Sequence, residues 1–254
     1  MSSRIYSTAD EEKDLENDSV LIGLINILLQ CLADCLSSPA LHALLEMDSS
    51  EVKACISAAK KKVRRLKQKN ELPPLSEDEA MAIHVYTQDC NVHKKLNELL
   101  RRRSRGQLKP FLPYLKLLLT ALHKLTPLAG TVFRGVHADL AAMYPKGREI
   151  VWWGFSSTTV SLEVLQNPEF LGREGKRTLF SIETKQALDV ERYSAIGGEQ
   201  ERLLLPGTCL VVKGLLDCGG GLTMVQLAPN EHEDDEPLIP GFAFAQHDNG
   251  RQYA

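Results

Sequence analysis

The sequence changes character at Gly130, and this change limits the folds that the chain can adopt. Upstream of Gly130, apolar residues recur at helical spacing, and Ser76 with Glu79 forms a capping box that is typical of a helix start. Downstream, short runs rich in Val, Ile, Thr and aromatic residues are bounded by Gly and Pro, as strands are. Helices first and strands afterwards predict an α+β protein with a segregated sheet, not alternating βαβ units.

The same patterns predict the individual elements. Helices are expected at residues 20–36, 39–47, 48–69, 76–86, 92–103 and 111–125, with short helical segments at 137–144 and 162–165. Strands are expected at residues 131–136, 151–157, 178–183, 202–205, 208–213 and 222–227. Because neighbouring residues of a strand point to opposite faces, we expect only one of Trp152 and Trp153 to pack in the core.

Composition narrows the class of protein. With 254 residues, 43% of them hydrophobic and 25% charged, the chain can build one globular domain with a helical addition. A net charge of -3 argues against general binding of nucleic acid. The six cysteines show no metal-binding spacing, so we expect them to be reduced and expect no bound metal. No signal peptide is visible, and the most apolar run, residues 21–36, is too short and too polar to insert into a membrane.

Two stretches of the helical part are strongly basic. The first consists of Lys60, Lys61, Lys62, Arg64, Arg65, Lys67 and Lys69, and the second of Arg101, Arg102, Arg103 and Arg105. We interpret the first as a solvated helix face, and the alternative is a docking surface for an acidic partner. The second fits a solvated helix end that the helix dipole favours.

A pair of acids precedes one of the expected strands. Glu199 and Glu201 stand two positions apart, and an apolar run follows that ends at Pro206-Gly207. If both lie at the strand entrance, the two-residue period of a strand points both carboxylates to one face, where they repel each other. Taken alone, this pattern is typical of a solvated loop rim.

Two segments upstream change that interpretation. Residues 132–136 read VFRGV, with Arg134 inside a strand, and residues 152–159 read WWGFSSTT. With Glu199 and Glu201, they resemble, in order and spacing, the F/Y-R-G, F-x-S-T-S/T and Q/E-x-E motifs of the Arg–Ser–Glu class of mono-ADP-ribosyltransferases. Residues 75–87, and Asn97 followed by Arg101, resemble the first helices of that family's catalytic domain, so the resemblance covers about residues 75–227.

The resemblance implies a fold and a division of the chain. We expect N-terminal helices followed by a mixed β-sandwich core. The chain then divides into a disordered N-terminus at residues 1–18, a helical annex at residues 19–70, a catalytic domain at residues 71–229 and a flexible acidic tail at residues 230–254.

The resemblance also implies NAD+ as the substrate and assigns roles to the motif residues. Glu201 would hydrogen-bond the nicotinamide-ribose 2′-hydroxyl and stabilise an oxocarbenium-like transition state, and Ser157 would hold that carboxylate. Arg134 would grip the diphosphate, because a guanidinium binds phosphate through two parallel hydrogen bonds. Gly135 would allow close approach of the dinucleotide, and Thr158 would support the turn.

The remaining assignments concern a loop and the acceptor. Phe170 and Arg173 match the aromatic and basic residues of the family's loop over the nicotinamide and diphosphate. Glu199 would orient or deprotonate an incoming arginine, since a charged guanidinium is a poor nucleophile. The position three residues before Glu199 is often aromatic in the family, but here it is Ile196, with Tyr193 three residues earlier. A Thr or Ser acceptor therefore stays open.

Three functions remain. The first is mono-ADP-ribosylation of a protein, the second is NAD+ hydrolysis, and the third is an interaction module on the same scaffold without catalysis. We expect a monomer without nucleic-acid partners that works in the cytoplasm, or a bacterial effector that reaches a host cytosol without a cleavable signal.

Overall fold

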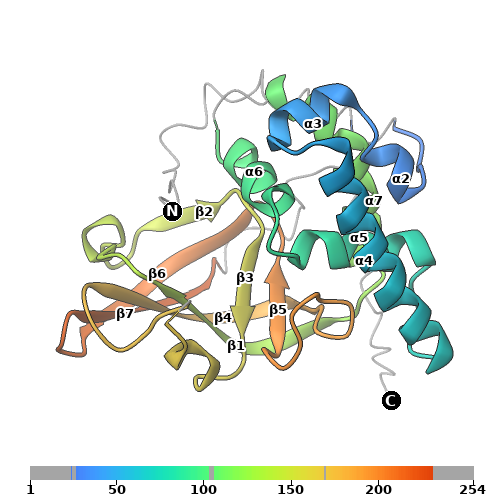
Figure 1. Ribbon diagram of the computed structural model, residues 1–254. Helices are drawn as coiled ribbons and strands as arrows, with labels where there is room; N and C mark the ends of the chain where they lie inside the picture. The colour runs from blue at the N-terminus through green and yellow to red at the C-terminus, as the bar shows by residue number, and fades with distance from the viewer. Residues whose placement is uncertain (1–23, 25–26, 103–105, 169, 231–254) are drawn as a thin grey trace, which may run out of the picture.

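The computed structural model of the protein describes residue 24 and residues 27–102, 106–168 and 170–230. Within these residues, helices come first and strands second, as predicted. Figure 1 shows the helices gathered at one side of the sheet. The predictions of a disordered stretch at residues 1–18 and of a flexible tail fall outside the described residues, apart from Asn230. Arg103 and Arg105 of the second basic stretch also lie outside them.

Most of the predicted helices are present. The α-helices are α2 (Leu32–Cys35), α3 (Pro39–Leu45), α4 (Ser49–Gln68), α5 (Glu77–Thr87), α6 (Asn91–Leu100) and α7 (Leu112–His123), and a 3-10 helix at Gly106–Phe111 precedes α7. The predicted capping box of Ser76 is present before α5, and Asp48 forms a second capping box before α4. The local sequence therefore determines where these two helices begin.

The helix predicted at residues 20–36 is only partly present among the described residues, as α2. Residues 27–31 have no helical structure, and Leu28 and Leu29 are 84% and 55% exposed. Helix α2 begins only at Leu32, whose backbone N–H donates to Asp78 Oδ1 at 2.9 Å. The start of helix α2 is therefore set by this contact with α5 and by the burial of Leu32. It is not set by the apolar periodicity of the sequence.

Helix α4 has one apolar side, formed by Val52, Ile56, Ala59, Val63 and Leu66. These residues join α5 and α7 in one hydrophobic cluster that also contains Leu203 of the sheet. The residues of the first basic stretch are exposed except for Lys62, which is half-buried. The helical annex therefore packs directly against the part of the chain that carries the motifs.

The strands form one mixed sheet that closes on itself. They are β1 (Pro127–Val136), β2 (Glu149–Trp152), β3 (Ser156–Thr159), β4 (Arg177–Asp189), β5 (Glu201–Leu204), β6 (Thr208–Asp217) and β7 (Leu222–Pro229). Their order is β1-β3-β5-β4-β7-β6-β2, and β1 also pairs with β4, which closes part of the sheet. Only β4 and β7 are parallel among the pairs of described strands. The predicted α+β class with a mixed β core is confirmed.

Strand β5 lies between two hydrophobic cores. Leu203 belongs to the cluster shared with the helices, and its neighbour Leu204 belongs to a second cluster inside the sheet. Because side chains two residues apart share a face of a strand, Glu201 points to the same side as Leu203, toward the helices. The strand period therefore places a carboxylate between sheet and helices.

The single strand predicted at residues 151–157 is wrong, because residues 153–155 separate β2 from β3. A Cβ at Gly154 would lie 3.1 Å from Asn97 Oδ1 and 3.1 Å from an Arg101 nitrogen, so the chain passes tightly by the end of α6 here. Trp152 is buried and donates its indole N–H to the Tyr144 hydroxyl at 3.2 Å, whereas Trp153 is half-buried. The expectation that only one tryptophan packs in the core is confirmed.

The short helical segments are smaller than predicted. They are 3-10 helices at Ala141–Met143 and Val164–Gln166.

We expect Ser76→Ala to lower the free energy of unfolding by about 1 kcal/mol, because the Ser76 hydroxyl accepts from the Glu79 backbone N–H at 3.3 Å. Urea unfolding of the variant and of Ser57→Ala, an exposed serine within α4, measures the difference. Equal losses in the two variants would contradict the capping role.

Candidate active site

The pairing of neighbouring strands brings Arg134, Ser157 and Glu201 together. Strand β5 pairs with β3, where Leu203 faces Ser157 and Glu201 faces Thr159, and β3 pairs with β1. The Ser157 hydroxyl donates to Glu201 Oε1 at 2.8 Å, and Arg134 Nη1 donates to the Ser157 carbonyl oxygen at 2.7 Å. Three residues far apart in sequence thus form one continuous chain of hydrogen bonds.

A second serine holds the other oxygen of the same carboxylate. The Ser194 hydroxyl donates to Glu201 Oε2 at 2.8 Å, and Ser194 is fully buried. Sequence reasoning missed this residue, because a serine seven positions before Glu201 belongs to none of the three motifs. The hydrogen bond is visible only once the loop between β4 and β5 is folded.

Burial dominates the electrostatics of Glu201. The residue is 7% exposed, and the loss of solvent raises the pKa of its carboxyl above the ordinary 4.5, against the opposing effect of the Ser157 and Ser194 hydroxyls. A carboxylate screened from water interacts strongly with a positive charge that develops beside it. The site is therefore suited to stabilise an oxocarbenium-like centre.

Two guanidinium groups, those of Arg134 and Arg101, interact electrostatically near the site. Burial lowers the pKa of Arg134, the positive charge of Arg101 lowers it further, and the Tyr86 phenol acts in the opposite direction. Both guanidiniums stay protonated at physiological pH. Two such groups in one place attract an anion such as a diphosphate.

Asn97, on α6, contributes an unsatisfied acceptor. Its amide nitrogen donates to the Tyr86 hydroxyl at 2.8 Å, while Asn97 Oδ1 is the one buried side-chain oxygen or nitrogen in the described part of the chain without a hydrogen-bond partner. A buried acceptor left unpaired costs about 1–3 kcal/mol. This oxygen is therefore a place where a donor group of water or of substrate would be stabilised.

The two acids are not related by the strand period. Strand β5 begins at Glu201, and the preceding Gln200 has a φ of 48°, in the left-handed region. Glu199 thus lies on the loop, is half-buried, and accepts at its backbone oxygen from the Thr159 hydroxyl at 2.7 Å. The position of Glu199 is therefore set by the turn at Gln200, and not by the alternation of side chains along a strand.

Thr158 and Gly135 have neighbours within the protein. Buried Thr158 donates its hydroxyl to the Arg202 carbonyl at 2.8 Å and so ties β3 to β5. A Cβ at Gly135 would lie 2.7 Å from Leu171 Cβ, so this glycine allows Leu171 to approach β1, and its expected role beside the dinucleotide stays a prediction. Both residues shape the site by packing.

Phe170 and Arg173 lie on the loop of residues 167–175. Phe170 is partly buried against Leu165, Leu171 and Leu179. Arg173 is exposed and donates to Gln166 Oε1 at 3.0 Å. Phe170 therefore packs on the inner side of the loop, and Arg173 lies on its exposed side.

Arg177, which sequence reasoning missed, holds this loop. Its guanidinium is buried and donates to the carbonyl oxygens of Gly175 at 3.2 Å, Gly172 at 2.9 Å and Gly220 at 3.2 Å. An arginine at the start of a strand carries no local signal for such a role. It ties the loop to the turn between β6 and β7.

Tyr193 and Ile196 lie on the loop that precedes Glu199. Tyr193 is buried, and its hydroxyl donates to the Leu72 carbonyl at 3.1 Å, so the ring serves the packing of the loop. Ile196 is 45% exposed. The side chain three residues before Glu199 is therefore exposed and aliphatic.

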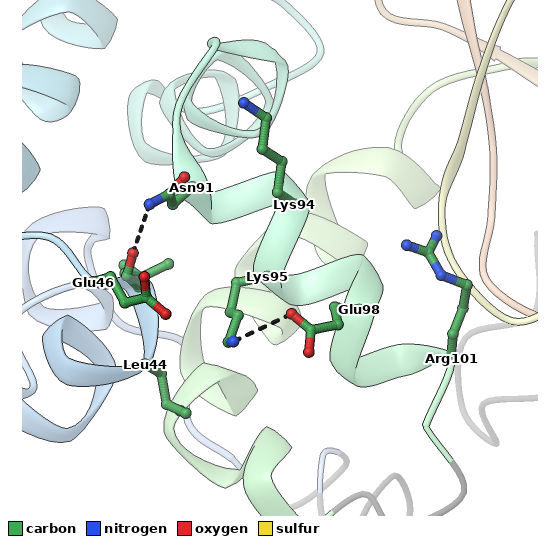
Figure 2. A pocket seen from close by; sticks show the side chains of 8 residues that line it. Leu44, Glu46, Asn91, Lys94, Lys95, Glu98 and Arg101 are labelled. Carbon is green, nitrogen blue, oxygen red and sulfur yellow. Dashed lines mark hydrogen bonds and ion pairs between the residues drawn. The ribbon is translucent and has the colours of Figure 1, made fainter. Parts of the chain in front are cut away.

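A pocket of about 330 Å³ lies elsewhere, between α3 and α6 (Figure 2). It is lined by Leu44, Leu45, Glu46, Asn91, Lys94, Lys95, Glu98 and Arg101. Arg101 is the only one of these residues that also acts on Arg134. Ser157 and Glu201 do not line this pocket. We therefore define the candidate site by the motif residues that lie together, and not by the pocket.

Comparison with known proteins agrees with this geometry. Residues 31–232 match the family described as NAD:arginine ADP-ribosyltransferase. The chain belongs to this family, and the expectation of an NAD+-dependent mono-ADP-ribosyltransferase is confirmed. The match begins inside the helical annex, which the motifs alone did not link to the family. A sequence search of curated proteins finds no match.

Solved structures share the fold. The type III effector XopAI from Xanthomonas axonopodis pv. citri is 12% identical, with a TM-score of 0.60 over 89% of this chain and 100% of that one. The eucaryotic mono-ADP-ribosyltransferase ART2.2 is 19% identical, with a TM-score of 0.53 over 89% and 90%. The ADP-ribosyltransferase Vis from Vibrio splendidus, solved with agmatine, is 18% identical, with a TM-score of 0.52 over 74% and 90%.

Two features are absent from the described residues. None of their helices is long and apolar enough to cross a bilayer. No group of three or more His, Cys, Asp or Glu side chains among them is arranged to hold a metal ion.

The raised pKa of Glu201 predicts the pH dependence of NAD+ cleavage. The transition state requires the ionised carboxylate, so activity falls as acidification protonates it. Because burial raises this pKa, we expect the acid limb of the kcat profile to lie above 4.5, the ordinary value for glutamate. Initial rates of NAD+ cleavage from pH 4 to pH 9 measure it, and a limb at or below 4.5 would contradict the assigned environment.

Proposed function

We propose that this enzyme transfers ADP-ribose from NAD+ to an arginine side chain of a protein. The observation that carries the proposal is the hydrogen-bonded connection of Arg134, Ser157 and Glu201 beside a loop that bears Glu199. This arrangement supplies an anion-binding group, a held carboxylate and a second acid for the acceptor.

In the proposed mechanism, Arg134 and Arg101 bind the diphosphate and fix NAD+ with its nicotinamide ribose at Glu201. The Glu201 carboxylate then stabilises the positive charge that develops as the bond to nicotinamide breaks, and nicotinamide leaves with the bonding electron pair. The acceptor attacks the resulting carbocation-like centre. Interactions of this kind strengthen in the transition state, so they raise kcat more than they improve binding.

Glu199 acts on the acceptor in this proposal. A guanidinium is charged at neutral pH and must lose or share a proton before it can attack, which an adjacent carboxylate favours. The complex of Vis with agmatine, a small guanidinium compound, supports an arginine-like acceptor. Thr and Ser remain the alternative acceptors, because the exposed residue three positions before Glu199 is Ile196 and not an aromatic residue.

The other expected site residues act less directly. Gly135 and Thr158 contribute through packing, and Phe170 and Arg173 contribute as parts of the loop beside β1. We retain the division into an annex at residues 19–70 and a catalytic domain at residues 71–229 as part of the proposal, although the two share one hydrophobic cluster.

The setting of the enzyme is also proposed. We infer a monomer that acts on proteins in a cytosol, either its own or that of a host cell that it enters as a bacterial effector. The likeness to a type III effector supports the second setting, and the likeness to a eucaryotic transferase is compatible with the first.

The two acids can be separated by mutation. We expect Glu201→Gln to reduce both transfer and NAD+ hydrolysis by at least about 100-fold, since it removes the charge that the transition state needs. Glu199→Ala should abolish transfer but leave hydrolysis within about threefold, because water needs no guanidinium partner. NAD+ labelled in the ADP-ribose moiety, incubated with a cell lysate, reports both reactions.

The outcomes distinguish the functions. Label on a protein band supports transfer, free ADP-ribose alone supports an NAD+ glycohydrolase, and neither product supports an interaction module. If Glu199→Ala loses hydrolysis as completely as Glu201→Gln does, the division of roles is wrong.

Arg134→Lys tests the diphosphate anchor. Lysine keeps the charge but loses the planar fork, so NAD+ should bind about 10- to 100-fold more weakly in titration calorimetry. Arg64→Lys, on the exposed face of α4, is the matched control and should bind NAD+ as the wild type does. Equal affinity of the Arg134 variant and the control would refute the anchor.

A further inference from the structure

The loop between β4 and β5 is held by helices that precede the sheet in sequence. Lys62 Nζ, on α4, donates to the Ser194 carbonyl at 3.0 Å, and His84 Nδ1, on α5, donates to the Tyr193 carbonyl at 3.0 Å. Thr87, at the end of α5, accepts from the Ala195 backbone N–H at 2.8 Å. Three consecutive loop residues are thus fixed through their main chain.

The connection between α4 and α5 adds further contacts to the same loop. The Tyr193 hydroxyl donates to the Leu72 carbonyl at 3.1 Å, and Arg192 Nη1 donates to the Glu71 carbonyl at 3.4 Å. These partners come from the helical annex, from α5 and from the segment between α4 and α5. Together with the bonds that the Tyr193 and Ser194 N–H groups donate to the Val190 carbonyl, they set the backbone position of the loop.

The hydroxyl at the centre of this anchored segment reaches the reacting carboxylate. Ser194 donates to Glu201 Oε2, while Ser157 donates to Oε1 from the opposite element. A carboxylate held on one oxygen can still rotate about its last side-chain bond, whereas donors on both oxygens fix the plane of the group. The other lone pairs of the two oxygens remain available to a ribose hydroxyl.

We propose that Ser194 is a positioning residue of the transferase, and that Lys62 of the helical annex fixes it so that the Glu201 carboxylate faces the ribose. The inference rests on the proposed function. It makes the N-terminal helices part of the catalytic apparatus, which their place in the sequence does not suggest.

The surroundings of Glu201 determine what loss of Ser194 does to its titration. Tyr86 of α5 and Arg134 of β1 face the site, and Ser157 of β3 donates to the carboxylate. Burial, the largest influence, favours the neutral acid, and the serine hydroxyls oppose it. Removal of one hydroxyl therefore leaves burial less opposed and moves the acid limb of the kcat profile to higher pH.

Ser194→Ala tests the proposal in the full-length protein. Hydrogen bonds to a charged group are strong enough that kcat for NAD+ cleavage should fall about 10- to 100-fold, with KM for NAD+ within about threefold. The acid limb should shift upward relative to the wild type. A residue that only stabilised the loop would lower the melting temperature without moving this limb.

Lys62→Met gives a second test that leaves both hydroxyl donors to Glu201, Ser157 and Ser194, in place. It removes the donor to the Ser194 carbonyl but keeps a side chain of similar length, and we expect kcat to fall about three- to tenfold, since a neutral acceptor loses one charge-assisted bond. Lys61→Met is the matched control, because Lys61 is exposed beside it on the same helix. The control should retain the wild-type kcat.

The outcomes separate this inference from the proposed function. Wild-type protein that cleaves no NAD+ overturns the proposed function and this inference with it. Wild-type cleavage together with an unchanged kcat and acid limb in Ser194→Ala overturns the inference alone. Equal kcat values for the Lys62 and Lys61 variants overturn the part assigned to the annex.

Discussion

The site depends on one buried carboxylate that is held at both oxygens. Burial makes the charge of Glu201 unfavourable, and the hydroxyls of Ser157 and Ser194 offset part of that cost. One donor comes from the sheet, through the pairing of β3 with β5, and the other comes from a loop fixed by helices. Neither layer of the protein completes the arrangement alone, so the packing of sheet on helices is a condition for the site.

Much of the core of the site was predictable because it is encoded locally. Arg134, Ser157 and Glu201 each lie in a short motif on a strand, and strand pairing brings such residues together. The capping boxes at Asp48 and Ser76 are also local, which is why the starts of α4 and α5 agree with expectation. The family resemblance supplied the order of the motifs, and the fold follows that order.

What escaped prediction is set by contacts between distant residues. The motifs do not link Lys62 to Ser194, or Arg177 to the glycines of two separate turns, because the partners are backbone carbonyls that any residue carries. The helix expected at residues 20–36 had the right periodicity, yet Leu28 and Leu29 are exposed. The motif around Gly135 also gave no sign that the missing side chain of this glycine makes room for Leu171. Local patterns thus predict elements better than they predict the neighbours of those elements.

The bonds from α4 and α5 to main-chain carbonyls of the loop have an evolutionary consequence. A backbone acceptor places no demand on the side chains of the loop, so the positions around Ile196 and Glu199, which we propose face the substrate protein, are free to diversify while the helices still hold the loop. Lineages could then change their targets without rebuilding the reaction centre. Hybrids that join the N-terminal helices of one relative to the strands of another would have to preserve the lysine and histidine donors, whatever the sequence of the loop they hold.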